Sequence, residues 1–152
     1  MFKPLTKLFN QTEQKNTSQQ LDEEIILFAG LLVEAAAVDG KIDESEILII
    51  KNSIIDFFKV TDEKADLIIN KCVENAGEPN LLYSFTSRIN KEFDYDKKIN
   101  LLEILWETIM ADGQIHDFES NLIRRLSGLM YISNIDCGNL KKKVLLKMNQ
   151  NN

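Results

Sequence analysis

The feature that most constrains this chain is an acidic motif that occurs twice. Residues 39–46 and 112–119 share the pattern Asp-Gly-x-Ile-x-x-x-Glu, and each copy follows a long apolar run. A repeated acidic turn of this kind, placed between apolar segments, predicts a pseudo-symmetric helical protein with one acidic centre. The motif does not identify a reaction.

The rest of the sequence favours helices throughout. From Leu21 onward the apolar residues recur with helical spacing. Six Gly and two Pro in 152 residues favour long helices over a turn-rich β fold. No stretch alternates with a period of two, so we predict an all-α fold, a single bundle of about seven helices with an internal pseudo-two-fold repeat. The helices are expected over residues 22–38, 43–58, 62–76, 80–92, 95–111, 117–130 and 134–148.

The N-terminal segment differs from the body of the chain. Residues 10–20 are polar and lack apolar periodicity, which is typical of a flexible segment. We therefore predict a flexible arm over residues 1–20 and a helical domain over residues 21–150. Near the start, four apolar residues share one helical face, and they indicate either a short docking peptide or a loosely packed segment. They are Phe2, Leu5, Leu8 and Phe9.

Composition excludes several classes of protein. The net charge of −6 argues against a nucleic-acid binder, which usually carries a basic face. The longest apolar run, residues 25–38, is shorter than the ~20 residues of a membrane span, and no secretory signal precedes it. Cys72 and Cys137 lie in no metal-binding spacing and are expected to be reduced thiols. We predict a cytoplasmic protein without an integral membrane segment.

Part of the repeated motif has a structural explanation. Gly40 is expected to take a left-handed conformation after a helix ends, and Ile42 to turn inward. Asp43 would then cap the next helix, with Glu46 completing an Asp-x-x-Glu capping box. The second copy has Gly113, Ile115, His116 and Glu119 at these positions.

Capping does not explain Asp39 and Asp112. Each lies at the negative end of a helix dipole, where a carboxylate is unfavourable by roughly 0.3–1 kcal/mol. One alternative is that both bond free amides of the following turn. The other is divalent-metal binding, because the motif matches the second half of an EF-hand calcium loop. The first two ligand positions of that loop are not acidic in either copy, so each copy supplies half a site.

Two half-sites form one centre if the repeat brings them together. Glu34 and Glu107 occupy equivalent places in the preceding apolar runs, where a buried carboxylate needs a cation. Ca²⁺ or Mg²⁺ would suit oxygen ligands, and Arg124 or Arg125 is the competing partner. His116 could ligate a softer metal or act as a polar cap. The candidate metal ligands are Glu34, Asp39, Asp43, Glu46, Glu107, Asp112, His116 and Glu119.

The sequence also predicts the environment of a lysine cluster in the last helix and of Arg88. The last helix contains a cluster of lysines that either docks an anionic lipid or partner, or complements the helix dipole and stays solvated; we expect the second. Its members are Lys141, Lys142, Lys143 and Lys147. Arg88 is expected to pair with an acidic side chain.

Several segments carry a family resemblance: residues 36–40 with Glu46, residues 105–113 with Glu119, residues 122–126 and residues 82–88. Through them the chain resembles the TerB-like family, whose namesake is the bacterial tellurite-resistance protein B. The resemblance implies an all-helical domain with internal pseudo-symmetry, an acidic surface that binds metal, and a link to stress resistance rather than to an enzyme activity.

The family's acidic positions match Asp39, Glu46, Asp112 and Glu119 in this sequence. His116 stands where the first copy has Asp43, so the two half-sites are not equivalent in their chemistry.

Three functions fit these observations. The first is a non-catalytic stress-response module that binds Ca²⁺ or Mg²⁺ at the acidic turns and acts through a protein partner. The second is a structural or adaptor protein whose acidic turns are only helix caps. The third is a hydrolase using metal-bound water, but no nucleophile motif or phosphate loop is found, so we expect no enzyme. A homodimer remains open, and no nucleic-acid partner is expected.

Overall fold

The computed structural model describes residues 17–38, 40–78, 80–110 and 117–150. Within these ranges the chain forms seven α-helices and no strand, which confirms the all-α prediction. The helices are α2 (Thr17–Ala36), α3 (Glu44–Phe58), α4 (Asp62–Glu74), α5 (Leu81–Glu92), α6 (Tyr95–Ile109), α7 (Asp117–Leu129) and α8 (Asn134–Gln150).

The helix boundaries follow local capping signals. The hydroxyl of Thr61 accepts a hydrogen bond from the backbone N–H of Lys64 at 3.1 Å, and Ser133 accepts one from Asp136 at 3.1 Å. Most helix boundaries lie within two residues of the predicted ones, and the start of the first helix differs by more. Helix α2 begins at Thr17, so the polar residues 17–20 are helical, whereas the sequence predicted the first helix from residue 22.

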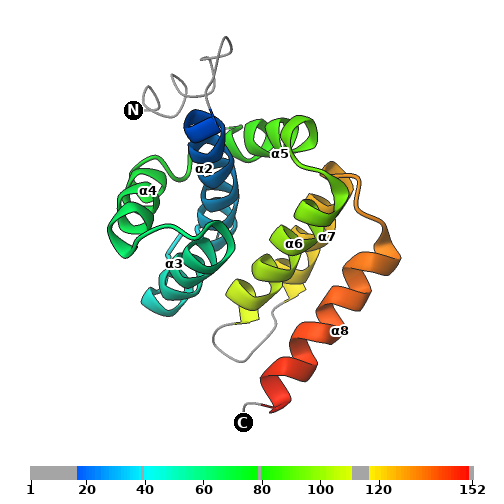
Figure 1. Cartoon of the computed structure of the whole chain (residues 1–152). Coiled ribbons are helices and arrows are strands. Elements are labelled where there is room, and N and C mark those ends of the chain that lie inside the picture. Colours follow the sequence, from blue (N-terminus) through cyan, green and yellow to red (C-terminus); the bar gives the residue numbers. More distant parts are fainter. Residues whose placement is uncertain (1–16, 39, 79, 111–116, 151–152) are drawn as a thin grey trace.

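Helix α2 is the central element of the fold. It packs against α3 and α4 on one side, and against α5 and α6 (Figure 1). Residues 25–33 are buried on every face, as expected of a helix that is apolar all round. Gly30 permits a close approach of α5, because an added Cβ would lie 2.4 Å from the ring of Phe85.

Helix α8 is the outer layer on the other side of the molecule. It packs on α6 and α7 and does not reach the central helix in the view of Figure 1. Cys137, Leu140 and Val144 are buried residues of α8 in the core. The helix therefore covers one face of α6, the helix that contains the second long apolar run.

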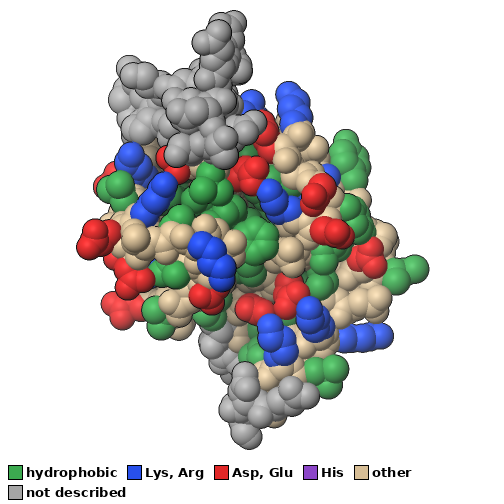
Figure 2. All heavy atoms as spheres, viewed as in Figure 1, with side chains coloured by type: hydrophobic (Ala, Val, Ile, Leu, Met, Phe, Trp, Pro, Cys, Tyr) green, Lys and Arg blue, Asp and Glu red, His purple; other side chains and the backbone are tan. Residues whose placement is uncertain are grey.

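The surface carries both signs of charge. On the face drawn in Figure 2, acidic and basic side chains are interspersed among apolar ones, with no large basic area. Among the described helices, none has the length and apolar character needed to cross a membrane.

Candidate cation site at the acidic turns

The first acidic turn has the predicted capping geometry. Gly40 has a φ of 89°, and its N–H donates to the carbonyl of Ala37 at 2.9 Å. The backbone N–H of Asp43 donates to Glu46 Oε1 at 2.9 Å, and the two residues form a capping box at the start of α3. The structural prediction for Gly40, Asp43 and Glu46 is confirmed in this copy.

The second turn is largely outside the described residues. Asp39 in the first copy, and Asp112 and His116 in the second, belong to the ranges that the structure does not describe. Glu119 lies in α7 and is partly buried. The proximity of the two copies, and the pseudo-two-fold relation between them, therefore stay predictions.

Glu34 is buried in α2, with 8% of the residue exposed. Both of its carboxylate oxygens accept from the backbone N–H of Gly77, at 3.3 and 3.2 Å. The alternative of an ion pair between Glu34 and Arg124 or Arg125 is not found among the described residues. The connection between α4 and α5 lies against this face of α2 and supplies the backbone N–H of Gly77 as the donor.

The surroundings of Glu34 disfavour its charged form. Burial raises the pKa of its carboxyl group, the hydrogen bond from Gly77 lowers it, and the nearby charge of Glu78 raises it further. The neighbouring thiol of Cys72 is affected in turn: its own burial, together with the charge of Glu34, raises its pKa to about 12. Both cysteines are free, as predicted, and both are buried.

Oxygen atoms suited to a hard cation lie on the same connection. Asn75 is buried, and its side-chain N–H donates to the carbonyl of Lys71 at 2.8 Å. The Asn75 Oδ1 accepts no hydrogen bond from the residues that the structure describes. Amide and carboxylate oxygens are the ligands that Ca²⁺ and Mg²⁺ prefer. The described residues contain no group of three His, Cys, Asp or Glu side chains arranged to hold a metal.

Glu107, the counterpart of Glu34, has a different environment. It pairs with Lys147 of α8 at 2.8 Å. One turn earlier, Glu103 pairs with Lys143 at 3.0 Å and with Lys147 at 3.3 Å. Among the described residues Glu107 therefore pairs with a lysine, and not with Arg124 or Arg125, the alternative to a metal. Lys143 and Lys147 stay solvated as predicted, with side chains 60% and 50% exposed, and they also pair with the acidic face of α6 because α8 lies alongside it.

The prediction for Arg88 is confirmed. Its guanidinium forms ion pairs with Glu23 of α2 and, at 3.4 Å, with Glu92 on its own helix. This joins α5 to the start of the central helix and leaves the Glu34 region at the other end of α2.

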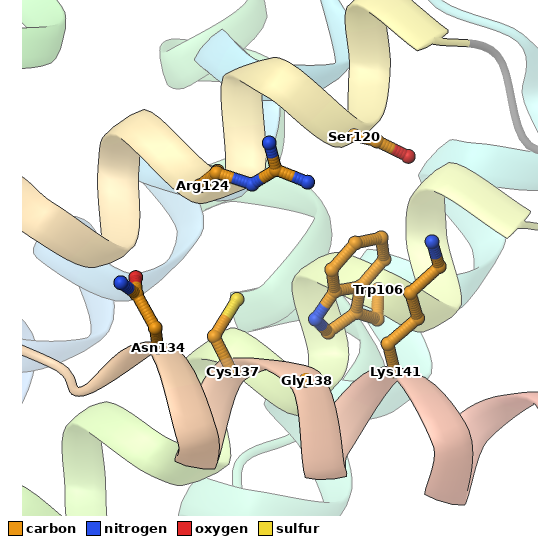
Figure 3. A pocket seen from close by; sticks show the side chains of 7 residues that line it. All are labelled: Trp106, Ser120, Arg124, Asn134, Cys137, Gly138 and Lys141. Carbon is orange, nitrogen blue, oxygen red and sulfur yellow. The ribbon is translucent and has the colours of Figure 1, made fainter.

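The sequence reasoning did not foresee a pocket between α6, α7 and α8. Its volume is about 440 Å³, and Trp106, Arg124 and Lys141 are among the side chains that line it (Figure 3). Part of the signal was present, because Ser120 and Arg124 are one turn apart on α7. The convergence of three helices at this point could not be inferred from spacing alone.

Within the described ranges, these features define an all-helical domain with an acidic turn between α2 and α3. The family model for the tellurite resistance protein TerB matches residues 26–142. The chain belongs to the TerB family, as its sequence resemblance indicated. Searches of curated proteins and of solved structures returned no match.

Proposed function

We propose that this TerB-family protein is a non-catalytic stress-response module that binds Ca²⁺ or Mg²⁺ at its acidic turns and passes this signal to a protein partner. The observation that carries the proposal is the buried carboxylate of Glu34. It lies beside a second acid, Glu78, and its only hydrogen-bond donor among the described residues is the Gly77 amide. A divalent cation would relieve the repulsion between these acids.

Two further groups support this assignment. Asn75 Oδ1 is a buried oxygen acceptor on the same connection as Gly77. Asp39 follows Glu34 by little more than one helical turn in the sequence, so it is the nearest acidic residue of the motif. We assign the cation to Glu34 and Asp39, with Asp112 joining them if the second turn approaches the first.

The proposal is tested by thermal unfolding after treatment with a chelator. Ca²⁺, Mg²⁺, Mn²⁺ and Zn²⁺ are added back one at a time to the wild type and to the Asp39→Asn/Asp112→Asn double variant. A cation present at about 100 times its dissociation constant adds about 2.7 kcal/mol to the free energy of unfolding. The expected result is a rise of several degrees in the wild type that is lost in the double variant.

A matched pair of variants tests whether the cation binds at the first copy of the motif. Glu34→Gln should reduce the response to added cation, whereas Glu107→Gln should leave it in place, because Glu107 already has Lys147 as a partner. An absence of any shift with all four ions would contradict the proposal.

A second candidate is a structural adaptor that binds no metal. The capping box of Asp43 and Glu46, and the ion pair of Glu107 with Lys147, account for three acidic residues without a ligand. This alternative predicts equal melting temperatures with and without cations, and mild destabilisation by Asp39→Asn. Neither candidate involves turnover, so we expect no metal-dependent hydrolysis.

A further inference from the structure

The pocket between α6, α7 and α8 is lined by groups that donate hydrogen bonds. Arg124 and Ser120 lie on its α7 side, and Lys141 on its α8 side, with Trp106 of α6 between them (Figure 3). Its volume of about 440 Å³ falls in the range of small-molecule sites, roughly 300–1,000 Å³. No Asp or Glu is among the described residues that line it.

Neither cation of the pocket has an acidic partner among the residues that the structure describes. Neither Arg124 nor Lys141 forms an ion pair with any residue in the described ranges, and the Lys141 ammonium lies 5.6 Å from the centre of the Trp106 ring. In Figure 3 the Arg124 and Lys141 side chains extend toward the space between α7 and α8. Two positive charges without an acid are unusual in a chain whose net charge is −6.

The buried donor of Trp106 is the second and independent observation. The residue is 3% exposed, and its indole Nε1–H has no hydrogen-bond partner among the residues described. An indole N–H can only donate, as can guanidinium and ammonium groups, so a ligand that satisfies all three must present acceptors. A buried donor left unpaired costs about 1–3 kcal/mol, which a bound acceptor would recover.

We propose that this pocket binds a small dianion whose charges are carried by phosphate or carboxylate oxygens. The planar guanidinium of Arg124 would donate hydrogen bonds to the anion, and the Lys141 ammonium would contribute a positive charge from the opposite side of the pocket. The Trp106 N–H and the Ser120 hydroxyl would supply further donors. This site is distinct from the Glu34 region and does not depend on cation binding there.

Trp106 provides the readout, because it is the only tryptophan in the chain. The full chain is titrated with inorganic phosphate or with succinate at constant ionic strength, with acetate as the monoanion control, while its fluorescence is recorded. The expected result is a saturable change with a dianion, at a concentration at least about tenfold lower than any response to acetate. A response to phosphate alone assigns a phosphate compound, and one to succinate alone assigns a dicarboxylate.

Two matched pairs of variants establish the location. Arg124→Gln should weaken binding by about tenfold or more, the loss expected for one charge-assisted hydrogen bond, whereas Arg125→Gln on the same helix should change it less than about twofold. Gly138 lines the pocket, and a Cβ there would meet no atom within 4 Å, so Gly138→Leu should fit and block the site. Gly128 on α7 has equal room, and Gly128→Leu should bind normally.

Three results would overturn the proposal. They are the absence of a saturable response up to about 10 mM dianion, an equal response to acetate, and binding by Arg124→Gln that matches that of Arg125→Gln. Since Arg124 is exposed, its variant is expected to fold, and far-ultraviolet circular dichroism checks this for all four.

Discussion

The two copies of the motif use the same helix face in different ways. Aligning Asp39 with Asp112 places Glu34 opposite Glu107, and Gly30 opposite Glu103. In α2 this face is pressed against α5 and the connection before it, and Glu34 is buried under an amide. In α6 the face carries two acids that α8 neutralises with lysines.

The difference teaches that a repeated sequence does not fix the chemistry of its residues. A glycine on α2 allows a neighbouring helix to approach closely, so the glutamate one turn later is taken out of water. On α6 the equivalent positions are Glu103 and Glu107, which pair with lysines of α8, and the Glu107 side chain stays 29% exposed. If a cation is needed by one copy, it is the first.

The largest expected effect comes from closing the space that Gly30 leaves. Gly30→Ala puts a Cβ 2.4 Å from the Phe85 ring, and overpacking of this kind costs about 1–3 kcal/mol in the free energy of unfolding, more than the gain in helix propensity of about 1 kcal/mol. Urea unfolding measures the difference. Gly128→Ala is the control, because nothing lies within 4 Å of its Cβ, and it should be neutral or stabilising.

A smaller effect on the free energy of unfolding is expected when the hydrogen-bond acceptor that Glu34 provides is removed. Glu34→Ala and Glu34→Gln both remove the charge, but only Gln retains an oxygen for the Gly77 N–H. Glu34→Ala should therefore unfold with a free energy about 1–2 kcal/mol lower than that of Glu34→Gln. Equal stabilities would show that water replaces the carboxylate at no cost.

The stability that Glu34 contributes in the first copy is expected to depend on pH. Burial raises the pKa of Glu34 in the folded state above its ordinary value of 4.5. The stability that this group contributes is complete below the unfolded pKa and is lost as the pH rises through the folded one. Since Glu34→Gln does not titrate, its stability relative to wild type should increase from about pH 4 to about pH 8. A relative stability that falls over this range would contradict the raised pKa.

The smallest effect is expected at the second copy. Lys147 is half-exposed, and its hydrogen bond to Glu107 raises its pKa above the ordinary 10.5, so the stability from this pair persists at neutral pH and is lost only as the pH rises through the folded pKa. Lys147→Met should lower the free energy of unfolding by about 0.2–1 kcal/mol at low salt. The loss should shrink in about 1 M salt, where exposed charges are screened. An effect that is independent of salt would point to packing instead.

The fold could be predicted from the sequence because its signals are local. The caps at Thr61 and Ser133, the left-handed Gly40 and the apolar spacing all act within a few residues, and each marks a helix end or face. The partners of the candidate site could not be predicted in this way. Glu34 meets Gly77 across 43 positions and Glu107 meets Lys147 across 40, so both contacts depend on how the helices pack.

The same reason explains the pocket at Trp106. Its donors come from three helices, and each helix alone shows only an ordinary polar or aromatic residue. The acidic motif stands out in the sequence because it is repeated, whereas a single tryptophan and scattered cations carry no comparable pattern. In the sequence, Lys141 is one member of the lysine cluster of the last helix, and nothing in that cluster points to Trp106.

The most direct measurement is an NMR titration of the Glu34 carboxyl carbon in the wild type, first in chelator and then with Ca²⁺ or Mg²⁺. In chelator, the pKa should lie above 4.5, because burial and Glu78 disfavour the charged form. Added cation should lower it, because a bound positive charge stabilises the carboxylate. A raised pKa that no cation shifts would contradict a cation site at the first acidic turn.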